Sequence, residues 1–254
     1  MSLTEDQRTR YARNILIPGI GEAGQERLRQ ARVMVVGLGG LGSPLCLYLA
    51  AAGVGVLGLL DSDRVELSNL QRQVLHVTPR IGRMKAASAA ECLAALNPDV
   101  RTEVYPHRVT SGNAPELLRE FDVVAEATDN FESKFIVNDV CLTLRKPFAT
   151  AGILALSGHA QFVAPGQTPC LRCSIPEPPA GTPTTAQQGV LGAVPGILGS
   201  IQAMEIIRWI AGLWKPEPDG SGRLHSIDGE TMYLRTIRVP RRPDCLCAPL
   251  WSGA

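Results

Sequence analysis

Short apolar, β-branched runs alternate with longer alanine-rich or amphipathic segments through the first 154 residues. The runs predict buried strands, because parallel strands are covered on both faces and read as continuous apolar sequence. These strands are predicted at 32–36, 55–60, 100–105, 122–127 and 147–154. Helices are predicted between them, at 22–30, 41–52, 85–96 and 131–144. The alternation predicts an α/β fold with a Rossmann-like, doubly wound and mainly parallel sheet.

The remainder of the chain follows a different pattern. Polar and apolar residues alternate at 157–164 and 223–239, which predicts antiparallel strands added to the sheet. Residues 176–183 are rich in proline and glycine and predict a mobile loop. The apolar segment 197–214 predicts a long helix, buried in the core or in an interface between two copies.

One uncharged stretch, residues 33–60, is longer than a membrane span requires. It contains seven glycines and Pro44, so it indicates strand, loop, helix and strand rather than one membrane helix. The formal net charge of the chain is +1, which leaves no excess positive charge for nucleic acid or an anionic membrane. The polar segment 1–10 lacks the apolar core of a signal peptide, and we expect a cytoplasmic protein.

A glycine-rich loop follows the first predicted strand. Gly37, Gly39 and Gly42 fit the G-x-G-x-x-G pattern, in which glycines allow a tight turn and the next helix offers free N–H groups to a phosphate. Asp61 follows the second predicted strand, where a carboxylate accepts hydrogen bonds from ribose hydroxyls. The loop therefore predicts a nucleotide site, but it does not separate an NAD-dependent oxidoreductase from an enzyme that uses ATP.

The residues after Asp61 favour ATP. Arg72 and Lys85 are cations and Asn69 is a neutral donor, a combination that suits a triphosphate whose charge builds up during attack. An NAD-dependent oxidoreductase leaves these cations unexplained. The structural alternative is an exposed polar loop that carries ordinary surface charge.

Asp129 and Asn130 follow another predicted strand, at the edge where such folds bind ligands. Asp129 is a candidate ligand for Mg²⁺, which takes one or two carboxylates together with phosphate oxygens. Either residue also suits the N-cap of the helix predicted at 131–144. The two roles are compatible, and the sequence leaves both open.

The chain has seven cysteines, and this odd number argues for reduced thiols rather than a disulfide framework. Cys46, Cys92 and Cys141 lie in apolar segments and are expected in the core. The other four form two pairs, Cys170-Leu171-Arg172-Cys173 and Cys245-Leu246-Cys247.

Taken together, several motifs resemble the ThiF/MoeB/HesA family, relatives of the ubiquitin-activating enzymes. The most specific motif is Ser68-Asn69-Leu70-Gln71-Arg72-Gln73, and the others include Tyr11-Ala12-Arg13-Asn14, Thr128-Asp129-Asn130 and residues 199–205. The resemblance covers nearly the whole chain. It implies one adenylation domain, residues 1–254, with a nucleotide-binding half at about 1–154 and a carrier- and metal-binding half at about 155–254.

The resemblance also implies an activity. Family members are homodimers that use Mg-ATP to adenylate the C-terminal Gly-Gly carboxylate of a ubiquitin-like sulfur-carrier protein, in molybdopterin, thiamine or related pathways. Catalytic roles are implied for Arg13, Asn69, Arg72, Lys85 and Asp129, with Arg13 reaching the phosphates of the other subunit. The implied nucleotide-binding positions are Gly37, Gly39, Gly40, Gly42, Asp61, Ser68, Asn69, Leu70, Gln71, Arg72, Lys85, Asp129 and Asn130.

The cysteine pairs depart from the family pattern. Family members hold a structural zinc ion with two C-x-x-C pairs, which implies zinc ligation by Cys170, Cys173, Cys245 and Cys247. The second pair is one residue short here, so the chain must bend differently to bring both thiolates to one metal. A redox role for Cys170 and Cys173 is the weaker alternative, because a thioredoxin-like context is absent.

A second departure concerns sulfur transfer. Many relatives carry, at the position of Thr185, a cysteine that links covalently to the carrier. Residues 174–190 contain no cysteine, and a hydroxyl forms no persulfide, so we expect adenylation without a covalent sulfur step. This difference keeps open an enzyme that adenylates a peptide or a carrier for a specialised metabolite. A non-catalytic subunit that only docks a ubiquitin-like protein is a further alternative.

Overall fold

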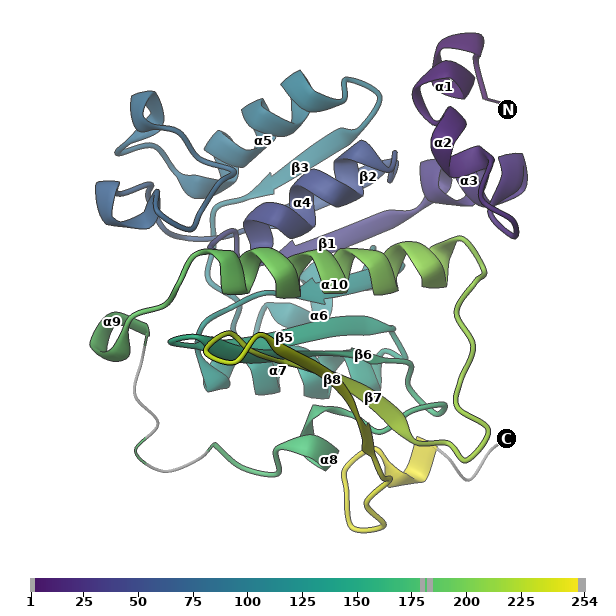
Figure 1. The fold of residues 1–254 in the computed structure, drawn as a ribbon, viewed down its shortest axis with the longest axis vertical. Helices are drawn as coiled ribbons and strands as arrows, with labels where there is room; N and C mark the ends of the chain where they lie inside the picture. The colour runs from purple at the N-terminus through teal and green to yellow at the C-terminus, as the bar shows by residue number, and fades with distance from the viewer. Residues whose placement is uncertain (1–2, 179–180, 182–184, 251–254) are drawn as a thin grey trace.

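The computed structural model describes residues 3–178, 181 and 185–250. These residues form one eight-stranded sheet in the order β3-β2-β1-β4-β5-β6-β7-β8 (Figure 1). The strands are β1 (Arg32–Val36), β2 (Val56–Leu60), β3 (Arg101–Tyr105), β4 (Val123–Glu126), β5 (Phe148–Leu154), β6 (Ser157–Val163), β7 (Gly222–Asp228) and β8 (Tyr233–Val239). The predicted α/β fold is confirmed.

Strands β1 to β5 are parallel, and β1 lies between β2 and β4. The chain proceeds from β1 to β2 and β3 on one side, and later returns to place β4 and β5 on the other. Val36, at the end of β1, is level with Leu60 of β2 and Glu126 of β4. Three carboxyl ends therefore meet where the strand order reverses, which is the place where open α/β sheets bind ligands.

Strands β6, β7 and β8 continue the sheet in antiparallel orientation, as the sequence predicts. The single stretch predicted at 223–239 is in fact a hairpin of β7 and β8. Its turn is closed by Asp228, whose carboxylate accepts hydrogen bonds from the Glu230 N–H and the Thr231 hydroxyl. The alternating pattern is the same in both strands, so it did not reveal the turn between them.

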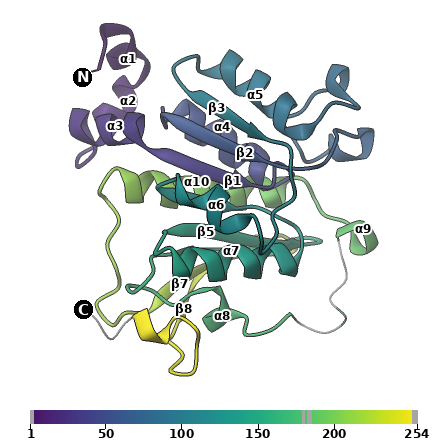
Figure 2. The same cartoon turned by 180° about the vertical axis from the view of Figure 1, so that it is seen from behind.

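Helices cover both faces of the sheet (Figures 1 and 2). One face carries α4 (Gly42–Ala51), α5 (Lys85–Leu96) and α10 (Ala193–Ile210), and the other carries α6 (Ala114–Arg119) and α7 (Phe131–Thr143). Along β1, Val33 and Val35 pack into the first core, while Met34 and Val36 pack into the second. The uncharged run at 33–60 is thus explained by two buried strands, β1 and β2, and the helix α4 that connects them.

The remaining helices lie before β1 and after β6. Three precede β1, namely α1 (Glu5–Arg10), α2 (Ala12–Ile15) and α3 (Gly21–Gln30). Two others are α8 (Leu171–Ser174) and α9 (Thr185–Gln188), and the 3₁₀ turns are η1 (Leu67–Asn69), η2 (Thr78–Arg80) and η3 (Ala248–Leu250). None of the helices in the described ranges has both the length and the hydrophobicity that crossing a bilayer requires.

Helix α10 begins and ends four residues earlier than predicted. Pro195 lies in its first turn, where no intrahelical N–H bond is needed and proline is tolerated. The helix ends before Gly212, which has φ +79° and cannot continue it. The predicted mobile loop falls partly outside the described residues, at 179–180 and 182–183. Of the cysteines expected in the core, Cys46 and Cys141 are buried and Cys92 is half-buried.

Candidate functional site

A cavity of about 380 Å³ lies at the carboxyl ends of β1, β2 and β4. We call it the nucleotide cavity. Its walls include eight of the positions predicted to bind nucleotide, namely Gly37, Gly39, Gly40, Asp61, Arg72, Lys85, Asp129 and Asn130. The fold therefore brings together residues that are spread over nearly a hundred positions of sequence.

The glycines of the loop have different structural reasons. Gly37 has φ +94°, and an added Cβ would lie 2.8 Å from the Ala127 carbonyl oxygen. A Cβ on Gly42 would lie 2.1 Å from the Gly37 carbonyl oxygen, so these two glycines are required by the turn itself. A Cβ on Gly39 would have nothing closer than Gln73 Nε2 at 3.6 Å. Gly39 instead keeps its backbone accessible from the cavity, beside the N-terminus of α4.

Asp61 ties the glycine loop to the end of β2. One carboxylate oxygen accepts a hydrogen bond from the Leu38 N–H at 2.8 Å, and the other accepts one from the Asp63 N–H at 2.8 Å. Burial raises the pKa of Asp61, and the nearby Lys85 ammonium partly opposes this rise. Each carboxylate oxygen retains a second acceptor site, which ribose hydroxyls can use.

Both predicted cations reach the same cavity. Lys85 begins α5, and its Nζ lies 2.9 Å from Asp63 Oδ2 with only 8% of the side chain exposed. Arg72 is half-buried, and its guanidinium donates to the Ser68 carbonyl oxygen at 3.2 Å. Both side chains line the cavity wall, where the carboxylates of Asp61, Asp63 and Asp129 also lie.

Five other predicted nucleotide positions do not line the cavity, namely Gly42, Ser68, Asn69, Leu70 and Gln71. Asn69 is buried, and its side-chain oxygen accepts the Glu66 N–H at 3.3 Å while its amide group donates to Ser68 Oγ at 3.4 Å. In this structure it shapes the turn that precedes Arg72. Gly42 acts through the packing of the glycine loop.

Arg13 lies far from its own nucleotide cavity. It is exposed on α2, which packs on α3, the helix that leads into the amino end of β1. Figure 1 shows these helices at the end of the sheet opposite the carboxyl edge. Arg13 therefore has no access to the nucleotide cavity of its own chain.

The structure separates the roles of Asp129 and Asn130. Asn130 is the N-cap of α7, and its side-chain oxygen accepts the Ser133 N–H at 2.9 Å. Asp129 is exposed at the cavity, and among the described residues its carboxylate has no hydrogen-bond or ion-pair partner. Asp129 is thus available to a cation.

Sequence reasoning missed the loop that follows β3. His107, Arg108 and Val109 line the nucleotide cavity, and Val109 together with Val36 and Leu60 provides an apolar wall. A flat base can pack against such a wall. The position of this loop, after a parallel strand next to the switch point, was the signal that could have revealed it.

A second cavity of about 470 Å³ adjoins the first. The two share Thr128, Asp129, Asn130 and Ile153. The second cavity extends between the start of α7 and strands β5 and β6, and Gly152, Gly158, Leu154 and Leu171 are among its lining residues. It is a largely apolar passage that ends at the nucleotide cavity.

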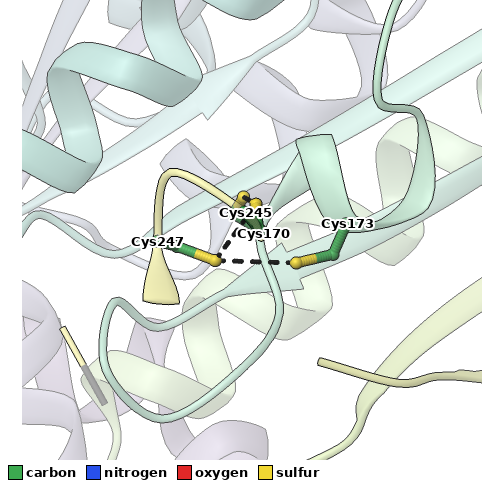
Figure 3. Close-up of side chains that lie close together, drawn as sticks. All are labelled: Cys170, Cys173, Cys245 and Cys247. Carbon is green, nitrogen blue, oxygen red and sulfur yellow. Dashed lines mark hydrogen bonds between the residues drawn. The ribbon is translucent and has the colours of Figure 1, made fainter. Parts of the chain in front are cut away.

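The four paired cysteines meet in one buried cluster (Figure 3). Their sulfur atoms all lie within 4.8 Å of one another, with contacts of 3.4 Å for Cys170–Cys245 and 3.5 Å for Cys173–Cys247 and Cys245–Cys247. Sulfurs around a tetrahedral zinc ion, with Zn–S bonds of about 2.3 Å, lie about 3.8 Å apart. The cluster therefore fits zinc.

The shortened pair reaches the cluster by successive turns. The Cys245 N–H donates to the Arg242 carbonyl, and the Cys245 and Cys247 carbonyls accept from Ala248 and Leu250. Hydrogen bonding from Cys170 and then Cys247 lowers the pKa of Cys173, whereas hydrogen bonding to Cys173 and Cys247 raises the pKa of Cys170.

Comparison with known proteins identifies the family of this chain. The sequence profile described as "ThiF family" matches residues 11–247. The chain belongs to the ThiF family. It is 42% identical to a sulfur carrier protein adenylyltransferase of Thermus thermophilus, over 96% of this chain and 92% of that protein. It is 45% identical to the mouse adenylyltransferase and sulfurtransferase MOCS3, over 96% of this chain but only 53% of that protein.

The chain thus spans about half the length of the MOCS3 relatives that it matches. The names of these relatives agree with the enzyme class that the sequence predicted, an adenylyltransferase. Among solved structures, Escherichia coli MccB with MccA-N7isoASN superposes with a TM-score of 0.83 at 21% identity, over 95% of this chain and 74% of that one. PaaA superposes with a TM-score of 0.76 at 24% identity, over 94% and 75%. These structural neighbours show the shared fold.

Proposed function

We propose that this chain uses Mg-ATP to adenylate the C-terminal Gly-Gly carboxylate of a ubiquitin-like sulfur carrier, which prepares the carrier for thiocarboxylate formation. The observation that carries the proposal is one cavity at the switch point that holds Asp61, Arg72, Lys85 and Asp129 together. A relative that this chain matches over almost its full length is named for the same activity.

The cavity suggests how ATP binds. The adenine packs against Val36, Leu60 and Val109, and the ribose hydroxyls donate to Asp61. The phosphates then follow the glycine loop toward Arg72 and Lys85. Backbone N–H groups and the N-terminus of α4 favour negative charge at this point.

Asp129 fits a role as magnesium ligand, because its exposed carboxylate borders the cavity and has no partner among the described residues. A magnesium ion bound there would neutralise charge on the phosphates. Asn130 keeps Asp129 in place by fixing the start of α7.

The reaction needs no covalent bond to the enzyme. A carboxylate oxygen of the carrier attacks the α-phosphorus, the bond from that phosphorus to its bridging oxygen breaks, and pyrophosphate leaves with the electron pair. Arg72 and Lys85 stabilise the charge that develops on the phosphates. The second cavity gives the carrier's tail a path to the α-phosphate, because both cavities share Thr128, Asp129 and Ile153.

The proposal includes a homodimer with a zinc site. Arg13 is exposed and distant from its own cavity, so it is free to reach the phosphates bound by a second copy. Cys170, Cys173, Cys245 and Cys247 would hold a structural zinc ion. The proposed division into a nucleotide-binding half up to about residue 154 and a carrier- and metal-binding half beyond it coincides with the end of β5.

The biological setting belongs to the proposal as well. We place the reaction in the cytoplasm and in a molybdopterin or thiamine type of pathway. An NAD-dependent oxidoreductase would use the glycine loop but would leave the cations at the cavity without a role. Peptide adenylation gains no support from the structural neighbours, because identities of 21–24% show the fold alone.

The proposal is tested by carrier-dependent exchange between ATP and labelled pyrophosphate, with NAD binding measured in parallel. We expect exchange only with a carrier that ends in Gly-Gly, and its loss in Arg72→Ala with the fold intact. Arg119→Ala, an exposed arginine of α6 outside both cavities, is the matched control. Near-normal exchange in Arg72→Ala would show that the nucleotide site is wrongly assigned. Tight NAD binding without exchange would favour the oxidoreductase.

A further inference from the structure

A buried ion pair lies beneath the edge that the two cavities share. Glu126 ends β4 and is fully buried, while Lys134 lies in α7 and is 7% exposed. Lys134 Nζ donates to Glu126 Oε2 at 2.8 Å. Lys134 also lines the second cavity. Burying a charged pair in this position costs desolvation free energy. The binding of nucleotide in the first cavity does not explain why the pair is there.

Glu126 does not depend on Lys134 alone. One of its oxygens accepts the Thr128 N–H at 2.8 Å and the Thr128 hydroxyl at 2.5 Å. The other accepts the Thr150 hydroxyl at 2.6 Å in addition to Lys134. The carboxylate is therefore held by four donors, of which only the Lys134 ammonium is charged.

Lys134 has one N–H bond left over. An ammonium group has three donors. One is given to Glu126, and a second to the Ala151 carbonyl at 2.5 Å. The described part of the chain offers no acceptor for the third. Because a buried donor without a partner costs free energy, this N–H is suited to an acceptor that enters the second cavity.

The surroundings favour a carboxylate as that acceptor. Gly152, Ile153 and Gly158 line the passage together with Lys134 and give this part of it an apolar wall. His159 also lines it, but burial, followed by the Lys134 charge, lowers the pKa of His159 to about 4, so this histidine adds no positive charge near neutral pH. One cation thus stands at the end of an apolar passage that opens into the nucleotide cavity.

We propose that Lys134 binds the C-terminal carboxylate of the incoming Gly-Gly tail, and that Glu126 and the Ala151 carbonyl hold its ammonium in position for this. The inference rests on the proposed function. It adds the group that recognises the reacting end of the substrate before attack on the α-phosphate. Asp129 borders the same passage, and its charge would be offset by the magnesium ion proposed there.

The test compares two fluorescent peptides that end in Gly-Gly, one with a free carboxylate and one with a carboxamide. Their affinities are measured in the presence of a non-hydrolysable ATP analogue. Wild-type protein should bind the carboxylate about 10- to 100-fold more tightly, as expected for one charge-assisted hydrogen bond in a buried site. Lys134→Met should lose this preference while its affinity for the nucleotide analogue stays unchanged. Lys134→Arg, which keeps the positive charge, should retain the preference for the carboxylate.

A double variant guards against misfolding. Lys134→Met leaves Glu126 charged and buried, whereas Glu126→Gln with Lys134→Met removes both charges, a replacement that buried pairs often tolerate. A stably folded Lys134→Met or double variant that keeps the carboxylate preference would overturn the role of Lys134. Absence of the preference in the wild-type protein would overturn it as well. Carrier-dependent pyrophosphate exchange, measured on the same wild-type protein, tests the proposed function separately, so the two failures are distinguishable.

Discussion

Asp129 and Asn130 are adjacent in the turn before α7, but their side chains point to different partners: Asn130 caps the helix and Asp129 lines the nucleotide cavity. Asn130 directs its side-chain oxygen back to the Ser133 N–H and starts α7. Asp129 leaves its carboxylate at the nucleotide cavity without a partner among the described residues. The Asn130 cap thus fixes the backbone of this turn, and the exposed Asp129 carboxylate remains available to bind a cation.

This division predicts opposite results for the two alanine variants. Asp129→Ala should abolish carrier-dependent pyrophosphate exchange and leave thermal stability near the wild-type value, because it breaks no hydrogen bond or ion pair among the described residues. Asn130→Ala should cost about 1 kcal/mol of unfolding free energy through loss of the cap. Denaturant unfolding and exchange, measured on both variants, check this. Normal exchange in Asp129→Ala would remove it from the site.

The glycine loop predicts different results for a second pair of alanine variants, Gly42→Ala and Gly39→Ala. A methyl group on Gly42 would meet the Gly37 carbonyl oxygen at 2.1 Å, so Gly42→Ala should destabilise the fold by about 1–3 kcal/mol. Gly39→Ala has room in the free protein and should keep wild-type stability. Its methyl group would occupy the phosphate path and weaken ATP binding about tenfold or more. Equal nucleotide affinity in wild type and Gly39→Ala would contradict this path.

Asp61 predicts a dependence on pH. Burial raises its pKa above the ordinary value of 3.8. Its contribution to folding stability is therefore fully present below the unfolded pKa and is lost as the pH rises through the folded pKa. Nucleotide binding follows the opposite direction, because protonation of Asp61 at low pH removes an acceptor for the ribose hydroxyls.

The pH effect is measured as the ratio of affinities for ATP and 2′,3′-dideoxy-ATP, in which other titrating groups cancel. The ratio should fall toward unity as the pH is lowered from neutral, starting above the ordinary pKa of an aspartic acid. A ratio that stays constant down to the pH of unfolding would refute the contact between Asp61 and the ribose.

The cysteine cluster predicts a metal. Purified protein should contain about one zinc ion per chain, bound through four thiolates. Cys173→Ser and Cys247→Ser should lose the metal and lower the melting temperature, whereas Cys92→Ser, at a half-buried site outside the cluster, should retain it. Elemental analysis showing far less than one zinc per chain in the wild type would show that the cluster is not a zinc site.

Local patterns in the sequence predicted much of this fold. Strand β1 and helix α5 have the predicted bounds, since each is a single uninterrupted apolar or alanine-rich segment. The glycine loop, Asp61 and the two cations at the cavity also follow from the order of elements in a parallel sheet. Strand β1 and helix α5 depend on neighbours close in the sequence, whereas the cavity residues depend on the order in which the strands are arranged.

The features that the sequence did not predict depend on contacts between residues that are far apart in the chain. The donors of Glu126 come from residues as far away as Thr150, and the acceptors of Lys134 include Ala151. Nothing in the local sequence shows that strand β5 brings these groups together. The same holds for Cys170 and Cys245, which are 75 residues apart. Their convergence depends on the C-terminal turns, which the shortened spacing alone could not specify.

The chemistry of Thr185 remains a prediction from the sequence. Its backbone lies in α9, and residues 174–190 contain no cysteine. We therefore expect no covalent adduct between carrier and enzyme when the reaction is examined by mass spectrometry without reductant. A carrier trapped on an enzyme cysteine would contradict adenylation as the only step.

The central claim is that the AMP group is transferred to the carrier's terminal carboxylate. Mass spectrometry of a Gly-Gly carrier after incubation with enzyme, ATP and magnesium tests this directly. The account predicts a carrier that gains the mass of AMP, pyrophosphate in equal amount, and no reaction with a carrier that lacks the last glycine. An unmodified carrier, or AMP bound to the enzyme instead, would contradict it.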